Sequence, residues 1–261
     1  PWKTLDNVVN TSKWLLTMWD IIYLKDFSDT NGIQIGHNTT VFYKWTQSHP
    51  FSLSSYPWFS NMFNWNPSSS VSIMNKYYLN SYWNFSKLKF DLKSTWIHAF
   101  YRSRIIWNEF TWQEATWMWG VVSWNWDQAG WWKLYWNYIH DFWNEDTSSL
   151  HHIFYLSNRD KTPNETYDLW WNHLRNNWAP HGLHIFDQSQ CWDWVWTFNI
   201  HNNYVINQKW CWVQIQWSCS VWAGRFTYDV NIYQNIIINE PTWPYRWTPI
   251  CLSSAALDWT A

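Results

Sequence analysis

The chain has 261 residues and a formal net charge of −2, and its composition is dominated by aromatic side chains. Aromatic residues make up 23% of the chain and charged residues 14%, against roughly 25% charged residues in an average soluble domain. Disordered chains lack such an aromatic content, and 17 Lys and Arg against 19 Asp and Glu do not suit a basic nucleic-acid binder. We therefore expect a folded chain that does not bind nucleic acid. No apolar run reaches the ~18 residues of a membrane span.

Tryptophan is frequent and glycine scarce, with 31 and 6 residues. Many of these tryptophans stand where Leu, Pro or Gly would be less costly. We interpret most of them as core or incidental residues.

The predicted elements are mostly strands. Residues 15–24 are consistent with a short helix or a strand, and residues 168–177 with a helical turn. Elsewhere an apolar residue recurs at every second position, which is the period of a β-strand. Strands are predicted over 71–77, 87–92, 100–107, 116–122, 135–142, 153–156 and 227–233.

The clearest alternation runs through residues 191–200 and 209–222. Trp192, Trp194, Trp196 and Phe198 share one face of the first run. Asn residues between the runs favour a turn, because Asn tolerates the left-handed conformation. We expect a β-hairpin here, and after residue 239 three prolines predict an irregular stretch.

Many short strands with Ser, Asn and Pro in the loops are typical of an antiparallel β-sandwich. The predicted fold is all-β, a jelly roll of the concanavalin type with an open concave cleft. No internal repeat is visible. We expect one domain over residues 1–240 and a C-terminal tail, 241–261, packed on it.

The four cysteines form no C-x-x-C pair, so a zinc ribbon is not expected, whereas two disulfides of unknown connectivity are. Glycosylation sequons stand at Asn10, Asn38, Asn84 and Asn164. The chain opens at Pro1 without an apolar signal segment, so a signal was either removed or never present. We expect a secreted, extracellular or cell-surface protein. The cysteines are Cys191, Cys211, Cys219 and Cys251.

Four sequence blocks occur in a familiar order. The first, HAFYRSRIIW from His98 followed by ATWMWG from Ala115, resembles two strands of the family 16 glycoside hydrolases, the laminarinase and lichenase group. The second, WWKLYWNYIHDFWN from Trp131, resembles their catalytic strand, and LHHIFY from Leu150 resembles the strand that follows it. The third block that resembles this family is FNIHNNYV, from Phe198. The fourth is VQIQWSCSVWAG, ending at Gly224, followed by YDVNIYQ, ending at Gln234.

The resemblance implies a β-glucan-active retaining glycoside hydrolase or transglycosylase, similar to endo-β-1,3-glucanases. Its nucleophile, assisting-acid and acid/base positions fall on Trp136, Tyr138 and Asp141. A retaining enzyme needs two carboxyl groups about 5–5.5 Å apart, and only Asp141 is acidic. Trp136 has no nucleophilic oxygen. The other nearby acids, Glu109 among them, are assigned to loops.

Two further readings remain open beside the enzyme. Members of such a family without the carboxylates would bind glucan rather than cut it, and a structural cell-surface or matrix protein could use its aromatic faces for assembly. Indole faces stack on pyranose rings, so clefts for sugars are lined with aromatic side chains. The positions implied for substrate binding are Trp112, Trp117, Trp131, His151 and Trp222.

No metal or other cofactor is expected. His181 and His184 lie near His173, yet no Cys or Glu completes a tetrahedral set. The resemblance also implies a structural calcium site, but its Asp position is Tyr228 here, with Asp229 one residue late.

One geometric expectation tests the alignment. Asp141 should face the central cleft on the same side as Trp136 and Tyr138, through a bulge near Ile139 and His140. Desolvation beside aromatic walls should raise the pKa of Asp141. Trp131 and His151 should lie within reach of the same sugar site.

Overall fold

The computed structural model describes residues 21–24, 28–29, 51–55, 61–64, 83–92, 97–98, 104–112, 122–124, 133–142, 152–158, 166–187, 196–217, 228–244 and 248–254. Within these ranges all regular elements are β-strands, and they form three sheets in which the paired strands are parallel.

Two sheets have eight strands and the third has six. Sheet 1 contains β1 (Ile21–Leu24), β3 (Phe51–Ser55), β5 (Trp83–Ser86), β8 (Arg104–Ile106), β11 (Lys133–Tyr135), β14 (Thr166–Trp170), β17 (Trp196–His201) and β20 (Tyr228–Tyr233). Sheet 2 contains β2 (Ser28–Asp29), β4 (Asn61–Asn64), β6 (Leu88–Leu92), β9 (Glu109–Trp112), β12 (Tyr138–Phe142), β15 (His173–Asn177), β18 (Tyr204–Gln208) and β21 (Ile236–Ile238). Sheet 3 contains β7 (Ile97–His98), β10 (Val122–Trp124), β13 (His152–Asn158), β16 (His181–Asp187), β19 (Cys211–Trp217) and β22 (Thr248–Ser254).

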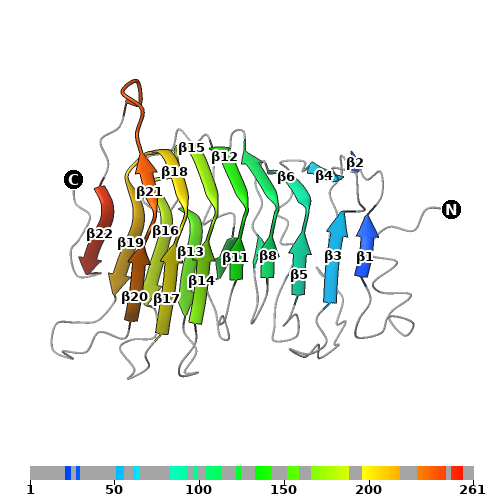
Figure 1. The fold of residues 1–261 in the computed structure, drawn as a ribbon, viewed down its shortest axis with the longest axis horizontal. Coiled ribbons are helices and arrows are strands. Elements are labelled where there is room, and N and C mark those ends of the chain that lie inside the picture. The colour runs from blue at the N-terminus through cyan, green and yellow to red at the C-terminus, as the bar shows by residue number, and fades with distance from the viewer. Residues whose placement is uncertain are drawn as a thin grey trace.

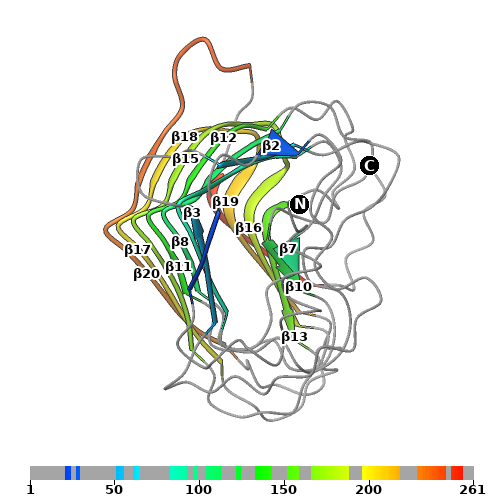
Figure 2. The same cartoon turned by 90° about the vertical axis from the view of Figure 1, so that its right-hand side faces the viewer.

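The chain visits the three sheets in turn, so that β14, β15 and β16 form one coil and β17, β18 and β19 form the next. Figure 1 shows the coils side by side along the long axis of the molecule. In the end-on view of Figure 2 the strands of each sheet lie behind one another around a common interior. The architecture is therefore a parallel β-helix.

Apolar side chains stack in rows inside this helix, one residue per coil. In sheet 1 the row runs through residues in direct register, each at most 1% exposed: Phe85, Ile105, Leu134, Leu169 and Ile200. Phe110, Ile139, Leu174 and Val205 form the matching row of sheet 2. Alternate residues of each strand point inward because side chains of a strand alternate between its two faces.

A two-residue corner joins sheets 1 and 2 in successive coils. Its first residue has a positive φ, as at Trp136 with φ 52° and Asn202 with φ 55°. Its second residue is an Asn in five coils, Asn108, Asn137, Asn172, Asn203 and Asn235; the first four are at most 2% exposed and Asn235 is half-buried. We call these five residues the asparagine ladder.

The parallel β-helix shows that the predicted antiparallel jelly-roll sandwich is wrong. The hairpin expected over residues 191–222 is not formed, because the turn at Asn202 and Asn203 carries the chain from β17 in sheet 1 to β18 in sheet 2. Alternation of apolar residues records which face of a strand is buried, but the direction of the neighbouring strand leaves no such mark.

Several strand boundaries also differ from the predictions. The helical turn expected over 168–177 is instead the end of β14, a corner at Trp171 and Asn172, and β15. The single strand expected over 135–142 is interrupted at Trp136 and Asn137. The stretch after residue 239, expected to be irregular, contains β22, which pairs with β19.

A disulfide joins Cys211 of β19 to Cys251 of β22 across a sequence separation of 40 residues. It ties the last strand of sheet 3 to the coil before it. Cys191 and Cys219 lie outside the described residues.

Candidate functional site

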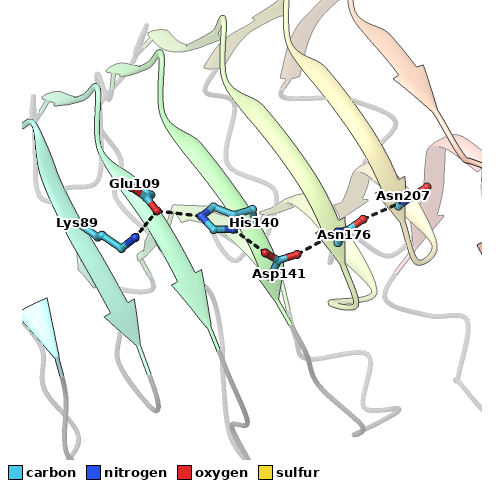
Figure 3. Close-up of polar contacts among 6 residues, drawn as sticks. All are labelled: Lys89, Glu109, His140, Asp141, Asn176 and Asn207. Carbon is cyan, nitrogen blue, oxygen red and sulfur yellow. Dashed lines mark hydrogen bonds and ion pairs between the residues drawn. The ribbon is translucent and has the colours of Figure 1, made fainter. Parts of the chain in front are cut away.

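A continuous row of polar side chains crosses the outer face of sheet 2. Lys89 Nζ lies 2.6 Å from Glu109 Oε1, which lies 3.1 Å from His140 Nε2. His140 Nδ1 in turn lies 2.8 Å from Asp141 Oδ2. Figure 3 shows these contacts reaching across the three neighbouring strands β6, β9 and β12.

Amide side chains continue the row over the next coils. Asn176 Nδ2 donates to Asp141 Oδ1 at 3.0 Å, and Asn207 Nδ2 donates to Asn176 Oδ1 at 2.9 Å (Figure 3). Asn207 Nδ2 also lies 3.0 Å from Glu240 Oε2, beyond β21. We call this set the polar row; it consists of Lys89, Glu109, His140, Asp141, Asn176, Asn207 and Glu240.

The backbone places the amide part of the row. Asp141, Asn176 and Asn207 occupy corresponding positions in three successive coils, with φ of 54°, 53° and 59°. Asp and Asn are the residues that tolerate this left-handed conformation best after glycine, since their short side chains bond locally. At Asp141 the pairing of β12 with β9 shifts register between His140 and Phe142.

Aromatic rings lie beside the polar row on the same face. The rings of Tyr138 and His140 are stacked, with centroids 4.2 Å apart. Tyr138, His173 and Tyr204 are neighbours in register, and their ring centroids are 5.0 and 5.1 Å apart. Tyr204 is 38% exposed, so the outer face of sheet 2 presents both hydrogen-bonding groups and aromatic surface to solvent.

Two carboxyl groups of the row, those of Glu109 and Asp141, are held in the ionised form. Partial burial raises the pKa of Glu109, but hydrogen bonds from Lys89 and His140 outweigh burial and leave the pKa below its usual value. Burial likewise raises the pKa of Asp141, and hydrogen bonds from His140 and Asn176 bring it below its usual value. The prediction of a raised pKa for Asp141 is therefore wrong, because the side chain is 59% exposed and has hydrogen-bond donors beside it.

The imidazole of His173 behaves differently. Burial lowers its pKa, and the positive charges of Arg175 and His140 lower it further. The ring is therefore predominantly neutral at pH 7, between two tyrosines.

The residues assigned to the catalytic strand are only partly brought together. Tyr138 stacks on His140, which is hydrogen-bonded to Asp141 near the end of β12. Trp136 precedes β12 and packs instead between Trp107 and Trp171, with ring centroids 5.2 and 4.9 Å away. A bulge was expected near Ile139 and His140, and the register shift lies between His140 and Phe142.

The faces of the Trp136 ring are covered by its two neighbours, which leaves the ring edge to solvent. A sugar ring stacks on an indole face, so Trp136 is a poor platform for it.

The other positions predicted for substrate binding give little information. Trp112 ends β9, opposite Phe142 in β12. Trp117, Trp131, His151 and Trp222 lie outside the described residues.

Glu109 was assigned to a loop, but it is the first residue of β9. Its side chain reaches His140 because β9 and β12 are adjacent parallel strands whose residues lie in register. Lys89, Asn176 and Asn207 were also missed. The recurrence of Asn at Asn108, Asn137, Asn172, Asn203 and Asn235 was the signal that could have shown the coil repeat, with separations of 29, 35, 31 and 32 residues.

Within the described ranges, no group of three or more His, Cys, Asp or Glu side chains has the arrangement of a metal site. His173 faces outward on sheet 2, whereas His181 and His184 are buried in β16 of sheet 3. Among the described residues no helix is long and apolar enough to cross a membrane.

No protein-family model, curated protein sequence or solved structure matches this chain.

Proposed function

We propose that this protein binds a polysaccharide along the outer face of sheet 2 and does not cleave it. The observation that carries the proposal is the polar row with its adjacent aromatic rings, a linear arrangement that runs from coil to coil along the helix. A linear sugar polymer offers hydroxyl groups and apolar ring faces at regular intervals, and carboxylates, amides and aromatic rings are the groups that bind them.

The state of the carboxyl groups favours binding over hydrolysis. Glycoside hydrolysis needs one carboxylic acid that is protonated near neutral pH and donates its proton to the leaving group. Both Glu109 and Asp141 have pKa values below their usual range, so neither holds that proton at neutral pH. The side chains serve instead as hydrogen-bond acceptors for hydroxyl groups.

We further propose an extracellular or cell-surface location. The Cys211–Cys251 disulfide supports it, since disulfides persist in oxidising compartments. Of the four glycosylation sequons, Asn84 lies on β5, and its amide donates to Ser52 Oγ at 3.2 Å.

Affinity electrophoresis and calorimetry with laminarin and lichenan, the β-glucans suggested by the sequence, test this function. We expect retarded migration and a measurable heat of binding. The Tyr204→Ala and Asp141→Ala variants should bind roughly tenfold more weakly, because each removes a solvent-facing group of the site.

Asn231→Ala is the matched control, since Asn231 lies exposed on sheet 1, away from the polar row, and donates to Asn199 there. Its affinity should equal that of the unmodified protein. Release of reducing sugar would show an enzyme instead, and unchanged affinity in both sheet 2 variants would place binding elsewhere. If the protein bound none of a panel of neutral and acidic polysaccharides, a structural role would be favoured.

A further inference from the structure

Three histidines lie buried together where β13 and β16 pair in sheet 3. His152 and His181 are each 2% exposed and His184 is 6% exposed. His152 and His181 are direct neighbours in register, and the ring centroids of the three residues are 4.4 to 5.7 Å apart. We call these three residues the histidine cluster.

The hydrogen bonds of His184 assign its protons. Its Nε2 lies 2.8 Å from Gln216 Oε1, so Nε2 carries a hydrogen that it donates to the carbonyl oxygen. Its Nδ1 lies 3.1 Å from His152 Nε2 and accepts the hydrogen of that nitrogen. A second proton on His184 would sit on Nδ1, so His152 Nε2 would have to change from hydrogen-bond donor to acceptor. Protonation of His184 therefore requires the His152–His184 pair to rearrange.

His181 has no means of accommodating a charge. Neither of its ring nitrogens has a hydrogen-bond partner. An imidazolium at this position would lose its hydration without gaining an acceptor, which is among the most costly arrangements for a buried cation.

Among the described residues, the groups that contact His181 and His184 carry no negative charge that would compensate an imidazolium. Tyr155 of β13 packs against His152 and His184, Phe186 of β16 packs against His184, and Trp210 packs against His181. From β19 the neutral amide of Gln216 is the hydrogen-bond partner. In register with His181 on β19 is Cys211, whose sulfur is held in the disulfide. Among these groups only Tyr155 titrates, and it would lose a proton only under alkaline conditions.

We propose that the histidine cluster is an acid-sensitive lock, which holds β13 and β16 together at neutral pH and opens this part of sheet 3 when its imidazoles are protonated. The lock is independent of the polar row, which lies on the outer face of sheet 2. Its consequence would be loss of sheet 3 packing in an acidic environment, with sheets 1 and 2 retained by the asparagine ladder.

The pH range follows from the shifts of two groups. Burial lowers the pKa of His184 from 6.5 to about 4, and burial and the nearby His184 lower the pKa of His181 well below 6.5. The unfolded chain takes up protons as the pH falls below 6.5, whereas the folded chain does not until about pH 4. The contribution of the neutral histidines to the free energy of unfolding is therefore fully present above pH 6.5 and is lost between pH 6.5 and 4.

Urea unfolding of the full chain at pH 7, 5.5 and 4 tests the proposal. For His184 alone, a pKa that moves from 6.5 to about 4 should raise the unfolding equilibrium constant on the order of 100-fold between pH 7 and 4. The His181→Phe variant keeps an aromatic ring and loses no hydrogen bond, so it should fold and show a smaller loss of stability over this range. The control is His201→Gln, which replaces a buried histidine of sheet 1 outside the histidine cluster. This variant should show the same loss of stability between pH 7 and 4 as the unmodified protein.

Hydrogen exchange of the unmodified protein at pH 7 and 4.5 provides a measurement that needs no variant. Amides of β13 and β16 should lose protection at pH 4.5 before those of β14 and β15. The proposal would be overturned by equal loss in all three sheets, by retained protection in β13 and β16, or by an undiminished pH effect in a folded His181→Phe variant.

Discussion

Three tryptophans occupy backbone conformations that residues with large side chains rarely adopt. Trp107, Trp136 and Trp171 have φ of 55°, 52° and 52° and occupy the same corner position in successive coils. In a residue with a Cβ this left-handed conformation costs roughly 1–2 kcal/mol, whereas glycine adopts it freely. Their rings are 54%, 39% and 46% exposed, so burial offsets little of this cost and mutual stacking is the main compensation.

A pair of substitutions at Trp136 separates backbone strain from stacking. Both Trp136→Gly and Trp136→Ala remove the ring contacts, but only glycine also relieves the left-handed backbone. We expect the glycine variant to be more stable than the alanine variant by about 1 kcal/mol in chemical denaturation. Equal stability of the two variants would show that the corner is not strained.

The backbone at this corner also predicts that the protein from its natural source carries glycine at these positions. The chain has 31 Trp and 6 Gly, and these left-handed corner positions, which suit glycine, carry tryptophan. A single codon, UGA, is read as tryptophan in some genetic codes and as glycine in others. We expect peptide mass spectrometry of the natural protein to find glycine at positions 107, 136 and 171; peptides containing tryptophan there would refute this expectation.

At the scale of the element, the asparagine ladder connects successive coils. The backbone N–H and the Nδ2 of Asn137 both donate to Asn172 Oδ1, at 3.1 and 3.0 Å. Asn172 repeats the arrangement with Asn203 and also donates to the carbonyl of Leu134 at 2.8 Å. From Asn108 to Asn203, each Asn thus satisfies buried groups of the coil before it and bonds to the coil after it, at the corner between two strands.

Removing one rung should therefore be costly. Asn172→Ala would leave the Asn137 donors and the Leu134 carbonyl buried without these partners, and we expect a loss of about 2–4 kcal/mol in the free energy of unfolding. Asn231→Ala removes an exposed amide that donates to Asn199, and should change stability by less than about 0.5 kcal/mol. Similar losses in the two variants would contradict the role of the ladder.

Two acids of the polar row, Glu109 and Asp141, should stabilise sheet 2 in a defined pH range. Because the folded-state pKa values of Glu109 and Asp141 lie below 4.5 and 3.8, their contribution is present above these values and is lost as the pH falls through the lowered ones. A Glu109→Gln, Asp141→Asn double variant should no longer show the loss of stability that protonation of these two carboxylates causes. At pH 7 the variant should lose less than about 1 kcal/mol, because the groups are partly exposed. An unchanged acid transition below pH 4 in circular dichroism would contradict this assignment.

For the whole molecule, the disulfide determines how firmly the last coil is held. Cys211 and Cys251 close a loop with a sequence separation of 40 residues, and restricting such a loop in the unfolded chain stabilises the fold by about 3–4 kcal/mol. The Cys211→Ser, Cys251→Ser double variant should lose this amount in thermal or urea unfolding. Hydrogen exchange should show the loss first in β22, and equal protection of β22 in both proteins would argue against this anchoring role.

The candidate site depends on the whole molecule in a way that local sequence could not show. Glu109, His140 and Asn176 are far apart in the chain and adjacent only because β9, β12 and β15 lie in register. The resemblance to family 16 directed attention to Asp141, which does lie in the polar row, but it also favoured Trp136, whose ring packs in a different row. An alignment along one strand cannot reveal a partner that comes from the next coil.

The sequence by itself determined that this chain is built of short strands, because alternating apolar residues reveal which side of each strand is buried. It also determined where several strands lie, since those predicted over 87–92, 153–156 and 227–233 correspond to β6, β13 and β20, and which residues could form its turns. Only the tertiary structure decided that neighbouring strands are parallel and that each turn of two residues leads to another sheet. The physical reason is that a buried face looks the same in either arrangement, whereas coil stacking is fixed by hydrogen bonds between residues about 30 positions apart, such as Asn108 and Asn137.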